Sequence, residues 1–143
     1  NFGKIEYLTK DKLDLKYRSS NLTDKYIVLK ADFRCKYSST SEILEKKNYI
    51  KLKRESSQPI KEKTSGSTFK NPSGKYAAVL IEQAGCKGMK NGGASVSAIH
   101  SNFIINNGEA SALDIENLGK KIIKQVQQKF GITLEWEIKI IGT

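Results

Sequence analysis

The chain has 143 residues, of which 38% are hydrophobic and 28% charged, a composition typical of one soluble globular domain. It contains no run of about eighteen uncharged apolar residues, so the sequence predicts no membrane span. Its first twenty residues are rich in charged side chains, which argues against a secretory signal, and we expect a cytoplasmic protein.

The net charge of +10 favours an anionic partner: nucleic acid, membrane headgroups or a phosphorylated small molecule. Arginine, the residue that nucleic-acid readers favour, occurs at only three positions, Arg18, Arg34 and Arg54, so we expect no nucleic-acid partner. The two cysteines, Cys35 and Cys86, lie far apart and outside any metal-binding spacing, so we expect reduced thiols and no metal site.

The first part of the chain is predicted to contain two strands and a helix. Residues 4–8 and 26–35 have strand composition, and alternate residues of the longer segment could face a core. Residues 17–21 between them are loop-like. Ser39 and Glu42 have the spacing of a capping box, which predicts the start of a basic, weakly amphipathic helix that continues towards residue 52.

A shift to Ser, Lys, Gln, Gly and Pro over residues 55–73 predicts a domain boundary, which we place near Gln58 and Pro59. Beyond it, residues 76–84 suit a short helix that Gly85 ends in a left-handed conformation.

Residues 94–97 and 103–106 are predicted strands, and a turn signal follows at 107–108. Ser111 and Asp114 form a second capping box. It begins a strongly periodic helix whose apolar residues recur every three or four positions: Ile115, Leu118, Ile122, Val126 and Phe130. Gly131 is its predicted stop, and the alternation of residues 134–140 predicts a final strand with Glu135, Glu137 and Lys139 opposite Trp136.

This order of elements favours an α+β fold over a doubly wound parallel sheet. The chain has neither a G-x-G-x-x-G motif nor a phosphate-loop signature, so most of any nucleotide-cofactor site would be missing.

The loop at residues 66–72 is the first candidate site. It places the Ser67 hydroxyl between a flexible glycine and the rigid Pro72, with Lys70 and Asn71 alongside, and predicts a polar binding loop. A solvated turn is the alternative for such a segment taken alone.

Seven segments occur in an order that resembles the C-terminal half of bacterial UDP-N-acetylenolpyruvoylglucosamine reductases. They are residues 17–20, 58–59, 66–72, 80–88, 92–94, 100–104 and 134–142. The resemblance spans essentially the whole chain, and the ordered set is specific although each motif alone is weak.

The resemblance implies a flavoenzyme of peptidoglycan synthesis. In that family, NADPH passes a hydride to FAD, and FAD passes it to the alkene of UDP-N-acetylglucosamine enolpyruvate, which gives UDP-N-acetylmuramate. Residues 1–57 resemble the C-terminal portion of the FAD-binding domain, and residues 58–143 resemble the substrate-binding domain. We expect the N-terminal flavin-binding half to be the missing partner, this piece to be inactive alone, and the full protein to be a monomer.

The resemblance also implies roles for six residues. Ser67 matches the family's proton donor, and Arg18 matches an active-site arginine suited to a carboxylate that becomes enolate-like. Glu137 matches the catalytic glutamate; an anion beside an enolate would repel it, so we infer that it is protonated or that it orients Arg18 or a water. Positions that contact substrate are matched by three further residues, Tyr17, Asn71 and His100.

Two positions depart from the family pattern. Ser57 stands where many relatives carry a lysine or arginine, and Lys139 replaces a common arginine, so contacts to the substrate diphosphate could come instead from Lys53, Arg54 or Lys61. The alternative for the whole chain is a basic, non-catalytic module that binds nucleic acid or another polyanion, with an affinity that falls steeply with salt.

Overall fold

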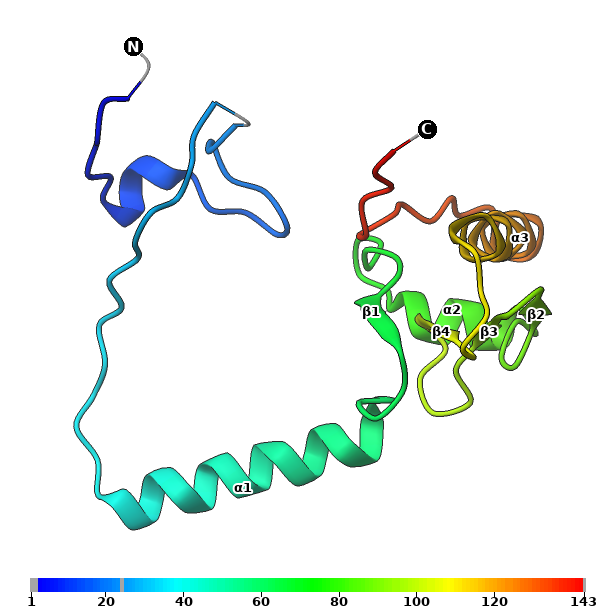
Figure 1. Cartoon of the computed structure of the whole chain (residues 1–143), viewed down its shortest axis with the longest axis horizontal. Coiled ribbons are helices and arrows are strands. Elements are labelled where there is room, and N and C mark those ends of the chain that lie inside the picture. Colours follow the sequence, from blue (N-terminus) through cyan, green and yellow to red (C-terminus); the bar gives the residue numbers. More distant parts are fainter. Residues whose placement is uncertain (1–2, 24, 143) are drawn as a thin grey trace. The chain divides into compact units, whose positions relative to one another are not determined.

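The computed structural model describes residues 3–23 and 25–142. The chain divides into two compact units, Asn1–Ser38 and Ser39–Thr143 (Figure 1). The second unit contains a small α+β domain with an antiparallel sheet, which confirms the α+β prediction.

The sheet has four short strands in the order β1-β4-β3-β2, and every neighbouring pair is antiparallel. Their bounds are Thr64–Ser67 for β1, Lys90–Asn91 for β2, Ala94–Val96 for β3 and Phe103–Asn106 for β4. β3 and β4 confirm the two strands predicted after the boundary. β1 and β2 were not predicted, because their polar residues have low strand propensity and pair only through contacts made by the folded domain.

The three α-helices confirm the sequence predictions. They are α1 at Thr40–Ser57, α2 at Ala77–Gln83 and α3 at Ala112–Phe130. Complete capping boxes begin α1, between Ser39 and Glu42, and α3, between Ser111 and Asp114. In each box two backbone amides, those of the serine and of the acidic residue three positions later, are satisfied by side chains of the same helix start.

The core lies where α2 and α3 pack together and where α3 covers β2 and β3. The apolar stripe predicted for α3 supplies its buried face: Leu118, Ile122 and Val126 are fully buried. They meet buried residues of α2, of the strands and of the two segments that flank them: Ala77, Leu80, Ile81, Val96, Ile104, Phe69 and Leu134.

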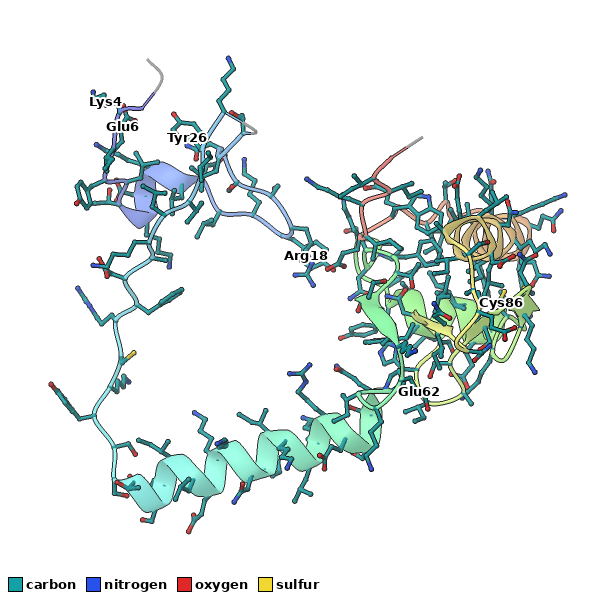
Figure 2. All side chains as sticks on the ribbon, viewed as in Figure 1. Lys4, Glu6, Arg18, Tyr26, Glu62 and Cys86 are labelled. Atoms are coloured by element: carbon teal, nitrogen blue, oxygen red, sulfur yellow. The ribbon has the colours of Figure 1, made fainter. Side chains whose placement is uncertain are left out.

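The helix α1 has no buried residue, and its side chains extend into solvent around the ribbon (Figure 2). Its apolar residues do not gather on one face, so the helix offers no stripe to bury. Among the described residues, no helix is both long and apolar enough to cross a membrane.

The first unit contains a short 3-10 helix, η1, at Lys10–Leu13, and a tight turn closed by backbone hydrogen bonds between Lys16 and Ser19. Asn21 ties the turn to the helix: its backbone N–H donates to the Leu13 carbonyl at 3.0 Å, and its side chain donates to the Lys12 carbonyl.

Three strand predictions are wrong within the described part of the chain. Residues 4–8 and 26–35 form no strand, because no other described segment pairs with them, and an extended chain without a partner leaves its hydrogen-bonding groups to solvent. The predicted final strand, 134–140, is reduced to one bridge between Phe69 and Trp136. Beyond that bridge Ile140 is 58% exposed, so the alternation does not continue to the end.

Candidate functional site

Ser67 is the last residue of β1 and follows a β-bulge. Thr64 pairs with Ile105 but Ser67 pairs with Phe103, so β1 has one more residue than β4 between these pairs. Gly66 lies in the extra stretch with φ at 89°, a region that favours glycine. Bulges often redirect side chains beside active sites. The glycine predicted to give the loop unusual angles therefore sets the direction of the chain immediately before the hydroxyl.

After Ser67, the chain is fixed by Asn102, which precedes β4. The Asn102 side chain accepts from the Phe69 N–H at 2.9 Å and donates to the Phe69 carbonyl at 2.8 Å. Its backbone carbonyl accepts from the Thr68 N–H at 2.8 Å. Three hydrogen bonds from one buried residue thus hold the segment next to the candidate proton donor. Asn102 belongs to a motif seen in the sequence, but its role could not be predicted because its partners lie 33 residues away.

Glu137 lies on a segment that runs beside this same stretch of chain. The Glu137 N–H donates to the Thr68 carbonyl at 2.9 Å, and the Lys70 N–H donates to the Glu135 carbonyl at 2.8 Å. The Lys70 ammonium also pairs with the Glu135 carboxylate at 3.2 Å. Residues about 70 positions apart in the sequence are thereby brought together. Glu137 donates one of these hydrogen bonds, and Ser67 is the neighbour of its acceptor, Thr68.

The Trp136 ring anchors the Glu137 segment. It lies 5.0 Å from the Phe69 ring, centre to centre, and against Gly119 in the middle of α3. A Cβ on Gly119 would fall 1.9 Å from Trp136 Cη2, so only glycine leaves room for the indole. The Trp136 ring therefore contacts both α3, at Gly119, and Phe69, which lies two residues after Ser67. Sequence analysis did not identify Gly119, since a lone glycine within a helical pattern carries no sign of what contacts it.

His100 occupies the turn between β3 and β4. Its Nδ1 accepts from the Asn102 N–H at 3.2 Å, and its ring meets Phe103 edge-on at 4.8 Å. The Ser97 hydroxyl accepts from the backbone N–H groups of Ile99 and His100, which tightens the turn. Burial lowers the pKa of His100 from its usual 6.5, although a backbone hydrogen bond opposes part of this effect. Both the lowered pKa and the bond to Nδ1 favour the neutral ring with its proton on Nε2.

Asn71 has a structural partner. Its side-chain oxygen accepts from the Ala77 N–H at 2.9 Å, at the first residue of α2. This bond closes the loop of residues 72–76, within which the Lys75 N–H donates to the Pro72 carbonyl at 3.0 Å. The predicted contact with substrate stays a prediction, and the structure adds a role in holding the loop.

Tyr17 and Arg18 lie at the tip of the turn in the first unit. Arg18 has φ at 54°, and its guanidinium carbon lies 5.1 Å from the centre of the Tyr17 ring. Positive φ is uncommon for a residue other than glycine and is more frequent at functional sites. The resemblance implies that Arg18 acts at the same site as Ser67 and Glu137, and this stays a prediction, because Arg18 belongs to a different unit.

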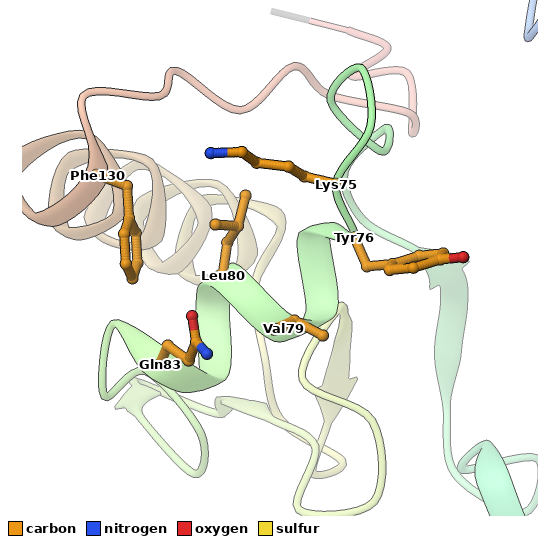
Figure 3. A pocket seen from close by; sticks show the side chains of 6 residues that line it. All are labelled: Lys75, Tyr76, Val79, Leu80, Gln83 and Phe130. Carbon is orange, nitrogen blue, oxygen red and sulfur yellow. The ribbon is translucent and has the colours of Figure 1, made fainter.

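The second unit also has a shallow hollow of about 310 Å³. It is lined by Lys75, Tyr76, Val79, Leu80, Gln83 and Phe130 (Figure 3). None of the predicted site residues contributes to it. The described residues contain no group of three or more His, Cys, Asp or Glu side chains arranged to hold a metal ion.

Residues 58–141 match the family model for the UDP-N-acetylenolpyruvoylglucosamine reductase C-terminal domain. The UDP-N-acetylenolpyruvoylglucosamine reductases of Rickettsia conorii and Novosphingobium aromaticivorans are 47% and 46% identical to the chain over 140 residues. These matches cover 98% of the chain but 48% and 47% of the relatives, so the chain spans about half of their length. The crystal structure of the Thermus caldophilus UDP-N-acetylenolpyruvylglucosamine reductase matches 89% of the chain and 46% of its own, with 37% identity and a TM-score of 0.74.

Proposed function

The chain belongs to the UDP-N-acetylenolpyruvoylglucosamine reductase family, and from this membership we propose that it forms the substrate-binding half of an FAD- and NADPH-dependent reductase of peptidoglycan synthesis. The enzyme would convert UDP-N-acetylglucosamine enolpyruvate to UDP-N-acetylmuramate in the cytoplasm. A flavin-binding half, matching the remaining length of the relatives, would complete it.

The observation that supports the proposal most directly is the hydrogen bond between the Glu137 N–H and the Thr68 carbonyl, at 2.9 Å. It holds the segment of Glu137 beside the strand that ends in Ser67, although nothing local in the sequence joins them. A solvated turn, the alternative for residues 66–72, would have no reason to be fixed on both sides by distant residues.

The reaction requires three kinds of group from the protein. Hydride addition to a conjugated enol ether leaves negative charge on the neighbouring carbon and its carboxylate. Ser67 would donate the proton that the carbanion-like intermediate needs, and Arg18 would bind the carboxylate as its charge grows. His100 would offer its Nε2–H to a substrate oxygen, as a neutral donor that does not compete with Arg18 for the charge.

The flavin would supply the hydride, but the second unit does not fit its pyrophosphate. Within its described residues, 39–142, no strand leads through a glycine-rich turn into a helix, and the Ser39 and Ser111 side chains already cap the starts of α1 and α3. We therefore assign FAD and NADPH to residues outside this unit and derive no step through them.

The test is a Ser67→Ala substitution in the complete, flavin-loaded enzyme. Reduction of the flavin by NADPH should be unchanged, while its reoxidation by UDP-N-acetylglucosamine enolpyruvate, followed by stopped-flow absorbance, should slow by about 10²–10⁴-fold. Ser65→Ala is the matched control, because Ser65 is an exposed serine of the same strand, and it should leave both rates unchanged. Reoxidation of the Ser67→Ala flavin at the normal rate would refute the assignment.

A further inference from the structure

Asn102 connects two parts of the candidate site that sequence analysis treated separately. Its side-chain amide uses both of its ends on Phe69, and its carbonyl takes the Thr68 N–H. Its own N–H donates to His100 Nδ1. The residue is only 4% exposed, so these bonds are shielded from water. One buried asparagine therefore touches both the backbone that follows Ser67 and the imidazole of His100.

We propose that Asn102 is a positioning residue for the reductase reaction, which fixes the strand end that carries Ser67 and holds the His100 ring in one orientation with its proton on Nε2. This inference rests on the proposed function. Asn102 does not itself contact reacting atoms in this scheme.

The geometry explains why an asparagine is needed. Phe69 presents an N–H and a carbonyl side by side, and only a carboxamide offers an acceptor and a donor at matching positions. An aspartate would keep the acceptor and lose the donor, while a leucine would leave both buried backbone groups without a partner. The pairing of β1 with β4 is irregular at Gly66, so the bonds to Asn102 add a second attachment just after Ser67.

The His100 half of the arrangement depends on the same turn. The Asn102 N–H can donate to Nδ1 only while that nitrogen is unprotonated, so the bond favours the neutral ring. The turn also contacts α2, where the Glu82 carboxylate accepts from the Ser101 hydroxyl at 3.5 Å and pairs with Lys87 at 2.8 Å. The contacts of the His100 ring itself are with the Asn102 backbone N–H and the Phe103 ring.

The experiment compares Asn102→Ala with Asn106→Ala. Asn106 is the matched control, since it is the last residue of β4, which Asn102 precedes, and its side chain also makes two bonds to backbone groups, accepting from Gly108 at 2.8 Å and Ala110 at 3.1 Å. His100 is the only histidine, so ¹⁵N-edited NMR of the 143-residue chain reports its tautomer and pKa without overlap. In the complete flavin-loaded enzyme, stopped-flow absorbance reports flavin reduction by NADPH and reoxidation by the enolpyruvyl substrate separately.

Asn102→Ala keeps the backbone N–H that donates to His100 Nδ1, but it removes both side-chain bonds to Phe69 that hold this backbone in place. The turn should therefore loosen, which moves the pKa of His100 upwards as the ring becomes more exposed to water and mixes its tautomers. Flavin reoxidation should slow by about 10²-fold, the cost of misplacing a catalytic group by about 1 Å, with flavin reduction unchanged. Asn106→Ala should change none of these. Asn102→Ser, whose single shorter hydroxyl cannot make both side-chain bonds to Phe69, should shift the pKa of His100 in the same direction if the alanine variant does not fold.

An unchanged His100 titration in the Asn102 variants, or equal effects from Asn106→Ala, would overturn the inference. Failure of the proposed function gives a different result, because the unmodified enzyme would then not reoxidise its flavin with the enolpyruvyl substrate. The NMR titration of His100 does not depend on activity.

Discussion

The contact between Gly119 and Trp136 gives the sharpest prediction about how the site is held. Gly119→Ala would add a methyl group whose carbon lies 1.9 Å from Trp136 Cη2 and 2.7 Å from Cζ3. Both distances are far below van der Waals contact, so the indole has to move. The movement would pull on the segment that carries Glu137, because Trp136 and Glu137 are adjacent.

Two opposing effects set the change in the free energy of unfolding caused by Gly119→Ala. Alanine is better than glycine inside a helix by about 1 kcal/mol, which would stabilise the variant. Overpacking a well-packed site costs about 1–3 kcal/mol, and a clash this severe belongs near the upper end of that range. We therefore expect Gly119→Ala to lower the free energy of unfolding by about 1–2 kcal/mol.

A double-mutant cycle with Trp136→Leu tests the reasoning through the sign of the effect. Leucine does not reach the position of the indole edge, so Gly119→Ala in that background should keep only its helix benefit and raise the free energy of unfolding by about 1 kcal/mol. Urea unfolding followed by circular dichroism measures all four proteins. If Gly119→Ala destabilises both backgrounds equally, the clash with Trp136 is not the cause.

Two other predictions concern the half-buried His100 ring and the buried Thr68 hydroxyl. Since burial lowers the pKa of His100, the unfolded chain takes up the proton first. The contribution of His100 to the free energy of unfolding is therefore fully present above pH 6.5 and is lost as the pH falls below it. His100→Gln should remove this decline, measured by urea unfolding across that pH range. The Thr68 hydroxyl is buried without a hydrogen-bond partner in the described structure, so Thr68→Val should raise the free energy of unfolding by about 1 kcal/mol. A loss of stability instead would show that the hydroxyl has a partner in solution.

The helices show how far local rules reach. Ser39 with Glu42 and Ser111 with Asp114 correctly predicted where α1 and α3 begin, and Gly131, with φ at 68°, ends α3 as expected. Caps are decided within four residues, so the sequence contains all the information they need. Residues 4–8 and 26–35 have equally clear strand composition but form no strand among the described residues, because pairing depends on a second segment that composition does not specify.

The candidate site divides along the same line. Its motifs, and the glycine that allows the bulge before Ser67, could be identified from the sequence. The role of Asn102 could not, nor could the dependence of Trp136 on Gly119, because each requires contact between residues that the chain separates by 17 or more positions.

The sequence by itself therefore determined the family, the helices and the residue types available for chemistry, since each is written in neighbouring residues or in the order of motifs. Only the tertiary structure decided which backbone groups meet: that β1 pairs with β4, that Asn102 binds Phe69, and that Glu137 lies beside Thr68. Hydrogen bonds and van der Waals contacts act over a few ångströms in space. The number of residues between two groups does not say whether the folded chain brings them that close.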